Sequence, residues 1–258
     1  MRSIRLTADL VARAGELIAL VRERRPRVHC ITNSVVQELT ANILLSAGAI
    51  PSMTTSPEEI GFFVSGADAV LVNLGTFDRE RRDALDIALE VARDDGIPWV
   101  LDPVFIERSE PRAELARALA QKEPRVVRAN AAEFGALLQR EPSAEALDRF
   151  ALDNITVAAC TGAIDIVTSG AKSVRIENGH PFMGQVTGIG CAETALLCAF
   201  VAAEDDEFIA AAAALLVMGV AGEVAAERAN GPGSFAVALI DTIATLDAGT
   251  IGKRARIT

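Results

Sequence analysis

A glycine-rich segment directly before an apolar stretch carries the clearest chemical signal in this sequence. It reads VTGIGCAE over residues 186–193 and leads into a helix expected over Cys191–Ala203. Gly188 and Gly190 leave successive backbone N–H groups unobstructed, and a helix that begins there adds the positive end of its dipole. The spacing predicts an anion site with Gly190 in its loop, although an ordinary turn into a helix has the same pattern.

Cys191 is the reactive group in this segment. A helix N-terminus lowers the pKa of a thiol below its usual value of about 8.5, so we expect Cys191 to act as a base or a nucleophile. A cysteine hydrolase is an alternative, and it needs a histidine partner. His29 lies in the middle of an expected strand, which is typical of a structural histidine, and His180 follows an Asn-Gly turn. Neither histidine is expected to face Cys191.

Three charged residues are candidates for holding a nucleotide's phosphates and their metal ion. Asp102 ends an expected strand and Glu133 lies near the start of an expected helix. Carboxylates of this kind hold Mg²⁺ together with waters and phosphate oxygens, and Arg128 is a phosphate ligand by type. Each residue also has a plainer interpretation. Asp102 precedes Pro103 in a turn, Glu133 complements a helix dipole, and a lone arginine is often a solvated surface residue.

The expected elements form an α/β fold with a largely parallel central sheet flanked by helices on both faces. The strands are expected at Val28–Thr32, Ala69–Asn73, Pro98–Asp102, Arg125–Val127, Ile155–Ala159, Ile164–Thr168 and Ser173–Glu177, the last two as an edge hairpin. The helices are expected at Val36–Ala47, Arg79–Asp95, Glu114–Gln121, Ala131–Leu138, Cys191–Ala203 and Glu207–Arg228. An earlier helix is expected to start at an N-cap, Thr7, with Asp9 in its first turn. No linker or repeat divides the chain, so we expect one domain over residues 1–258.

Polar or glycine-rich residues follow five of the expected strands. They are Asn33, Gly75-Thr76, Asp102, Asn130 and Thr161-Gly162. Turn formation explains each of them singly. Because open α/β sheets bind ligands at the carboxyl ends of their parallel strands, the five together favour one shared site.

Composition argues against several kinds of partner. The chain has 258 residues and a net charge of −10, which disfavours nucleic acid and anionic membranes. Its longest apolar run, residues 208–222, is shorter than the roughly 20 residues that span a bilayer, so we expect a buried helix. Four cysteines without a CxxC pair and a charge-interrupted N-terminal segment favour a cytoplasmic protein with reduced thiols and no zinc site.

A set of short strings covers residues 26–243. They read VHCITNSVVQELTANILLSAGAIPSM, PEEI, LVNLGTF, VLDPV, VVRANAAE, CTG, ENGHPFM, VTGIGCAETA, GVAGEVAAER and GPGSFAVALIDTI. In this order they resemble the bacterial hydroxyethylthiazole kinases of the ribokinase-like superfamily. The resemblance implies phosphorylation of 4-methyl-5-(2-hydroxyethyl)thiazole, a reaction of thiamine salvage, by ATP with Mg²⁺. It also implies homotrimers with active sites between subunits.

The same resemblance implies a role for each matched residue. The implied residues are Met53, Asn33 and Gly188 for the thiazole, Arg128 and Thr161 for ATP, and Asp102 and Glu133 for Mg²⁺. Cys191 stands where ribokinase-like relatives carry the general-base aspartate of GxGD.

Three departures from the family pattern leave alternatives open. Residues 105–109 read FIERS where the family has a glycine-rich GxGAT, RAN replaces RGN, and GIGC replaces GTGC. One alternative is a weak or inactive paralogue that binds nucleotide or thiazole as a sensor. Another is a kinase for a different small alcohol, such as a hydroxymethylpyrimidine, although the ITN and PSM strings favour the thiazole.

Overall fold

The computed structural model describes the backbone of residues 2–258 and the side chains of residues 7–258. Its centre is an eight-stranded sheet in the order β2-β1-β3-β4-β5-β6-β7-β8, counted over the described chain. The strands are β1 (Arg27–Ile31), β2 (Ile50–Ser52), β3 (Ala69–Asn73), β4 (Trp99–Asp102), β5 (Val126–Asn130), β6 (Val157–Thr161), β7 (Asp165–Thr168) and β8 (Ser173–Ile176). Strands β1 to β6 pair in parallel, and β7 and β8 add an antiparallel hairpin at one edge. The largely parallel sheet and the edge hairpin are confirmed.

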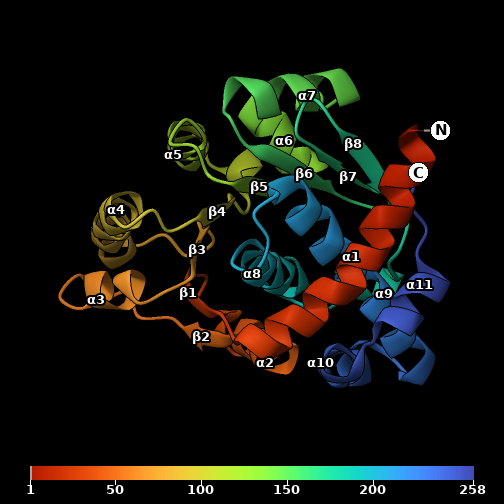
Figure 1. Ribbon diagram of the computed structural model, residues 1–258. Coiled ribbons are helices and arrows are strands. Elements are labelled where there is room, and N and C mark those ends of the chain that lie inside the picture. The colour runs from red at the N-terminus through yellow and green to blue at the C-terminus, as the bar shows by residue number, and fades with distance from the viewer. Residues whose placement is uncertain (1) are drawn as a thin grey trace.

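Helices cover both faces of this sheet, as Figure 1 shows. One face carries α1 (Arg2–Arg24), α2 (Gln37–Ala47), α8 (Ile189–Val201), α9 (Glu207–Arg228), α10 (Pro232–Thr245) and α11 (Ala248–Arg254). The other carries α3 (Ile60–Ser65), α4 (Arg79–Asp94), α5 (Glu110–Ala120), α6 (Ala131–Leu138) and α7 (Ala144–Asp153). Two short 3-10 helices, η1 (Ile106–Arg108) and η2 (Pro181–Gln185), lie in the connections.

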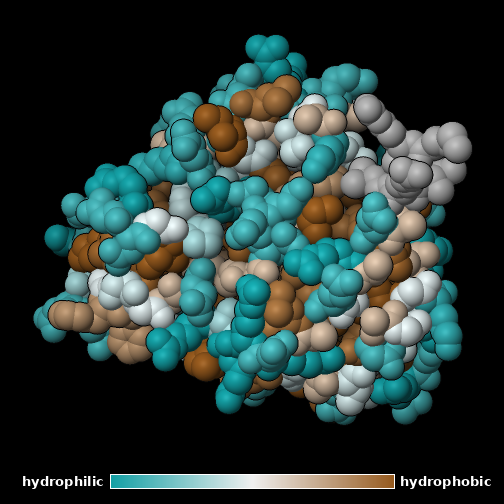
Figure 2. Space-filling view, viewed as in Figure 1, coloured by the Kyte–Doolittle hydropathy of each residue, from teal (hydrophilic) through white to brown (hydrophobic). Residues whose placement is uncertain are grey.

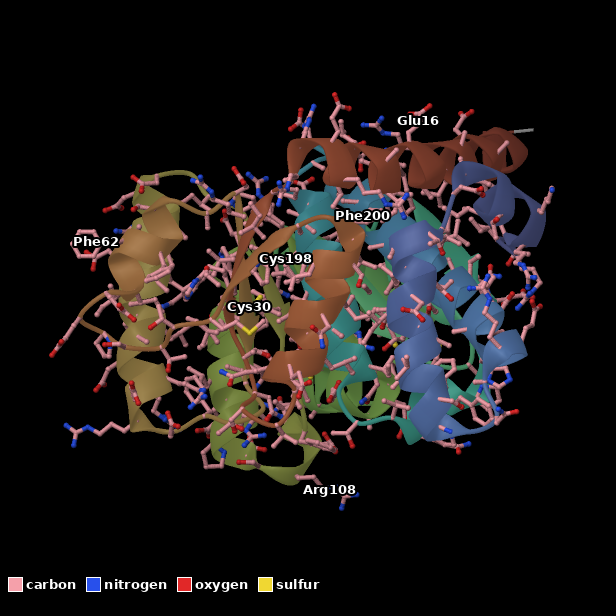
Figure 3. The ribbon with its side chains drawn as sticks, turned by 90° about the horizontal axis from the view of Figure 1, so that it is seen from below. Glu16, Cys30, Phe62, Arg108, Cys198 and Phe200 are labelled. Atoms are coloured by element: carbon pink, nitrogen blue, oxygen red, sulfur yellow. The ribbon has the colours of Figure 1, made fainter. Side chains whose placement is uncertain are left out.

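Each face of the sheet has its own core because successive strand residues point to opposite faces. In β3, Leu71 packs in the core under α8 and α9, whereas Val70 and Val72 pack in the core under α4. All five residues of β3 are buried, as expected for a strand covered on both sides. Figure 3 shows Cys198 and Phe200 of α8 directed inward, whereas Phe62 and Arg108 point outward.

Helix α9 is apolar around its whole circumference, and it is the one described helix long and apolar enough to cross a membrane. It instead packs between α1, α8 and α10, and sixteen of its residues are buried. The expectation of a buried helix is confirmed. The surface in Figure 2 is mainly hydrophilic with separate hydrophobic areas, as is usual for a folded domain.

Several local predictions need correction. Thr7 is not an N-cap, because α1 begins at Arg2 and continues through Thr7 and Asp9. Four helices (α3, α7, α10 and α11) and the three-residue strand β2 were not predicted. Helix α8 begins at Ile189, two residues before its expected start.

Candidate active site

The carboxyl edge of the parallel strands brings together most of the residues singled out in the sequence. Asn73 and Asp102 end adjacent strands and are paired in register, as are Asn130 and Thr161. Arg128 lies two residues before the end of β5. The amino end of α8 lies against this edge, because Glu193 and Thr194 near its start hydrogen-bond to Arg128 and Asp102.

Asp102 is a buried carboxylate with one unused oxygen. Its side chain accepts hydrogen bonds at Oδ2 from Nδ2 of Asn73, at 2.6 Å, and from Oγ1 of Thr194, at 3.2 Å. Its Oδ1 is buried and has no hydrogen-bond partner among the described residues. Burial raises the pKa of Asp102 to about 7, against the opposing charge of Arg128. An orphaned carboxylate oxygen at this edge fits a cation or a donated proton.

Glu133 already uses both of its carboxylate oxygens. Oε2 accepts from the backbone N–H of Asn130 at 2.9 Å and closes a capping box at the start of α6. Oε1 accepts from the N–H of Phe105, also at 2.9 Å. Glu133 therefore fastens the segment after β4 to the start of α6. Within residues 7–258, no group of three or more His, Cys, Asp or Glu side chains is arranged to hold a metal ion.

Arg128 is held close to the first turn of α8 rather than in solvent. Its Nη2 donates to Oε2 of Glu193 at 2.7 Å, and its side chain is 12% exposed. Burial alone would lower the pKa of Arg128, but Glu193, Asp102 and Glu133 raise it above its usual value. Its charge is therefore permanent, and it lies among carboxylates at the carboxyl edge.

The start of α8 offers backbone donors that no side chain caps. Gly188 is the N-cap, with a left-handed φ of 90°. The first hydrogen bond of the helix joins the N–H of Ala192 to the carbonyl of Gly188. The N–H groups of Ile189, Gly190 and Cys191 precede it, so they have no acceptor within the helix, as at any helix N-terminus. This geometry fits an anion.

Cys191 has the opposite acidity from the one predicted. Burial, together with the charge of Asp102, raises the pKa of its thiol to about 12. The side chain is 8% exposed and packs with Val36 and Val104. Desolvation of the thiolate outweighs the helix dipole here, so the prediction of an acidic thiol is wrong.

Two of the residues implied for the thiazole, Gly188 and Asn33, lie on segments that pack together. A Cβ on Gly188 would come within 2.6 Å of Val36 Cγ1, so the α8 loop packs directly on the segment that follows Asn33. The side chain of Asn33 accepts from Oγ1 of Thr76 at 2.8 Å and from the N–H of Val35 at 3.0 Å. Met53 is half-buried just after β2, against the core under α2.

The segment that follows β4 has a strained backbone. Val104 and Phe105 have φ angles of 23° and 56°, in the left-handed region that favours glycine. Phe105 is 61% exposed, so its side chain contributes little to the core. The backbone has a glycine-like conformation although neither residue is glycine.

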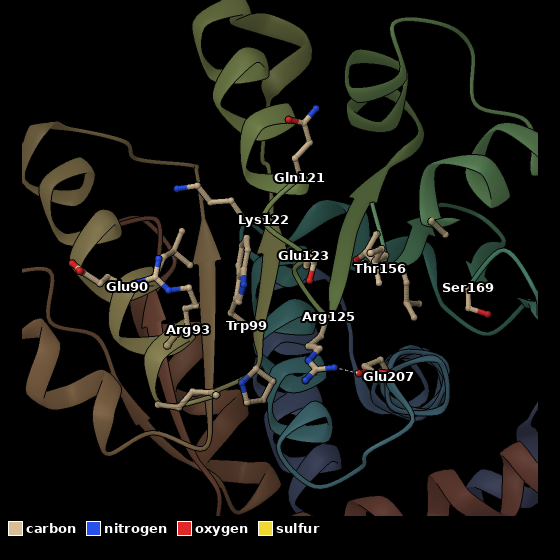
Figure 4. A pocket seen from close by; sticks show the side chains of 18 of the residues that line it. Glu90, Arg93, Trp99, Gln121, Lys122, Glu123, Arg125, Thr156, Ser169 and Glu207 are labelled. Atoms are coloured by element: carbon tan, nitrogen blue, oxygen red, sulfur yellow. Dashed lines mark hydrogen bonds and ion pairs between the residues drawn. The ribbon is translucent and has the colours of Figure 1, made fainter. Parts of the chain in front are cut away.

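A cavity lies at the opposite end of the sheet. It has a volume of about 1160 Å³ and opens at the amino ends of β4, β5 and β6, beside Trp99, Arg125 and Thr156 (Figure 4). Arg125 there is paired with Glu207 at 2.5 Å. Among the described residues, no buried and unpartnered side-chain N or O atom lines this cavity, in contrast to Asp102 and Arg128 at the carboxyl edge. The carboxyl edge is therefore the candidate site.

Sequence reasoning missed Asn73, Glu193 and Thr194, whose side chains hold Asp102 and Arg128. A signal was present for two of them. Glu193 and Thr194 are polar residues in an otherwise apolar helix, and such residues need partners when buried. His29, by contrast, was predicted as a structural histidine, and both of its ring nitrogens have hydrogen-bond partners.

Comparison with known proteins relates this geometry to a family. A family model described as the hydroxyethylthiazole kinase family matches residues 18–249. The chain is 44% identical over 246 residues to the probable hydroxyethylthiazole kinase of Agrobacterium fabrum, with 95% of each protein covered. A solved structure of a hydroxyethylthiazole kinase from Pyrococcus horikoshii OT3 superposes with a TM-score of 0.90 at 37% identity, over 95% of this chain and 98% of that one.

A more distant structure shows the fold alone. A ribokinase-like superfamily protein from Enterococcus faecalis superposes with a TM-score of 0.65 at 14% identity, covering 86% of this chain and 88% of that one. The expected ribokinase-like fold is confirmed.

Proposed function

The chain belongs to the hydroxyethylthiazole kinase family, and we propose that it transfers the γ-phosphoryl group of ATP to the primary hydroxyl of 4-methyl-5-(2-hydroxyethyl)thiazole. This reaction would serve thiamine salvage. The observation that carries the proposal is the joint position of three features at the carboxyl edge. They are the uncapped amides at the start of α8, the guanidinium of Arg128, and the unpartnered oxygen Oδ1 of Asp102.

The anion site would hold the transferring phosphoryl group. Phosphoryl transfer depends mainly on positioning and on stabilising charge at the phosphoryl oxygens. The amides of residues 189–191 are fixed by the helix, so they need no rearrangement when charge develops. Arg128 and Thr161, on neighbouring strands, would contact the nucleotide.

Cys191 would orient the attacking hydroxyl rather than remove its proton. With a thiol pKa of about 12, Cys191 stays protonated at neutral pH. In a loose transition state the hydroxyl proton can leave late, so a strong base is not required. We propose that Asn33, Met53 and Gly188 place the thiazole so that its hydroxyl lies near this thiol.

Asp102 is the residue best suited to Mg²⁺. Its Oδ1 is buried and unpartnered, and an oxygen of this kind fits a magnesium ion completed by water and phosphate oxygens. Glu133 would lie in the surroundings of the ion, because its own oxygens accept backbone N–H groups. Bound Mg²⁺ would offset charge on the nucleotide's phosphates.

We propose a homotrimer in the cytoplasm, formed from one domain over residues 1–258, with sites between subunits. Large exposed apolar residues on α2, β2 and α3 support an interface at this edge of the sheet. They are Val35, Leu45, Ile50, Phe62 and Phe63, just before α2 or within these elements. A Phe62→Glu variant should shift the light-scattering mass from trimer toward monomer and lower activity, whereas an unchanged mass would contradict this interface.

The strained segment at Val104 and Phe105 supports one alternative, a sensor that binds without turnover. The two functions differ in a coupled assay of ADP release with and without the thiazole alcohol. Thiazole-dependent release supports the kinase. Calorimetric binding of both the thiazole and MgATP, without ADP release, supports the sensor instead.

A further inference from the structure

Glu193 forms a buried ion pair that no part of the proposed chemistry uses directly. Its side chain is 7% exposed and lies in the second turn of α8. Oε2 of Glu193 accepts from Nη2 of Arg128 at 2.7 Å. Because Glu193 binds Arg128, which is proposed to contact the nucleotide, its effect on the reaction would pass through Arg128.

The position of Arg128 depends on a close approach to α8. A Cβ on Gly190 would lie 2.8 Å from Nη1 of Arg128 and 3.1 Å from its Nη2. The guanidinium therefore rests against the bare Cα of Gly190, beside the uncapped amides of the first turn. Gly190 and Glu193 are three residues apart and share a face of the helix.

The guanidinium is only partly satisfied by the protein. Nη2 is the one nitrogen of Arg128 with a hydrogen-bond partner among the described residues, and Nε is buried without any. A buried arginine with spare donors, held by one carboxylate, is arranged to receive a second anion.

We infer that Glu193 is a positioning residue, which fixes the Arg128 guanidinium against the first turn of α8 so that its spare donors face the bound phosphate. The inference rests on the proposed function. One helix then supplies both the amide donors and the carboxylate that orients the arginine. A misplacement of about 1 Å can cost a hundredfold in rate, so holding Arg128 in place has kinetic consequences.

Two conservative substitutions of Glu193 distinguish a positioning role from a merely structural ion pair. Glu193→Gln keeps the length of the side chain and an acceptor oxygen, whereas Glu193→Asp keeps the charge and loses one methylene. Positioning predicts that Gln stays within about threefold of the wild-type kcat/KM for ATP. It predicts that Asp falls about tenfold and Ala about thirtyfold. A structural ion pair predicts the reverse order, with Asp close to wild type.

A double-mutant cycle tests whether Glu193 acts through Arg128. In an Arg128→Met background, Glu193→Ala should lower kcat/KM by less than about twofold more, because the residue that it positions is gone. Glu204→Ala, which removes a partner of Arg13 in a more exposed ion pair away from the site, serves as the matched control and should leave activity unchanged.

Two results would overturn the inference. The first is a folded Glu193→Ala variant whose kcat/KM lies within twofold of the wild-type value. The second is a double variant in which the losses of kcat/KM from Arg128→Met and Glu193→Ala multiply, as they do for independent residues. Should Glu193→Ala not fold, the order of kcat/KM in Glu193→Gln and Glu193→Asp decides.

A wild-type protein without turnover counts against the proposed function alone. The same variants are then ranked by calorimetric affinity for MgATP, where equal affinities of Gln, Asp and wild type would overturn the positioning role.

Discussion

The side-chain amide of Asn73 donates to Oδ2 of Asp102 at 2.6 Å, and Oδ1 of the same carboxylate has no partner among the described residues. One oxygen is thus held in place while the other remains available at the carboxyl edge of the sheet. Burial raises the pKa of this carboxyl to about 7, so its charged form is costly without a cation beside it. This arrangement lowers the stability of the folded protein but holds one carboxylate oxygen ready to bind a cation.

Replacing Asp102 by Asn should therefore separate activity from stability. Asp102→Asn keeps an acceptor for Asn73 and Thr194 and removes the buried charge, so the midpoint of thermal unfolding should stay the same or rise. We expect kcat to fall by about a hundredfold, because the oxygen suited to Mg²⁺ is lost. Thermal unfolding and the ADP-release assay measure the two effects. A variant with wild-type kcat would show that Asp102 has no part in the reaction.

Removing the Cys191 thiol should affect turnover more than binding. Because the thiol is protonated and buried, we expect Cys191→Ala to lower kcat about tenfold with little change in KM for the thiazole alcohol. Cys191→Ser, which keeps a polar group there, should lie between Ala and wild type. Steady-state kinetics measure both, and an unchanged kcat in Cys191→Ala would remove this residue from the mechanism.

Adding a methyl group at Gly190 should displace Arg128. The new Cβ would lie 2.8 Å from Nη1 of Arg128, too close for an ordinary contact. We expect Gly190→Ala to raise KM for ATP about tenfold and to lower kcat. Gly184→Ala is the matched control, since a Cβ at Gly184 meets nothing within 4 Å. Equal kinetics in the two variants would argue against a role for the Arg128–α8 contact.

Glycine at position 105 should stabilise the protein. Phe105 has a left-handed backbone, which costs a non-glycine residue about 1 kcal/mol, and its exposed side chain contributes little burial. We expect Phe105→Gly to raise the free energy of unfolding by about 1 kcal/mol, measured by urea denaturation. Val237→Gly, at an exposed helical position, should instead lower it by about 0.4 kcal/mol. A loss of stability in Phe105→Gly would mean that the aromatic ring stabilises this segment.

His29 should make the protein less stable in mild acid. Burial lowers its pKa from 6.5 to about 4, so the unfolded chain binds a proton between these values while the folded protein does not. Stability from this group is complete above pH 6.5 and falls as the pH drops toward 4, by about 3 kcal/mol in all. Urea denaturation of wild type and His29→Gln over this range isolates the effect. Parallel pH dependences would exclude it.

Local sequence patterns predicted much of the fold, and they predicted at which end of the sheet the candidate site lies. The buried strand β3 and the helices α6 and α9 were predicted with their observed bounds, because apolar runs and periods of hydrophobicity are properties of neighbouring residues. The glycines at 188 and 190 likewise indicate that a helix, α8, begins nearby. Strand β2 was missed because three residues carry too little pattern.

The sequence alone determined which groups could bind phosphate. The tertiary structure decided which of these groups are protonated and which are held in ion pairs. The acidity of Cys191 depends on desolvation by Val36 and Val104, which are distant along the chain. Arg128 and Glu193 are 65 residues apart, and only the packing of α8 against the sheet brings them within 2.7 Å. Residue type and spacing determine which hydrogen-bond donors and acceptors the chain carries. Burial and contacts between distant residues determine their pKa values and which ion pairs form.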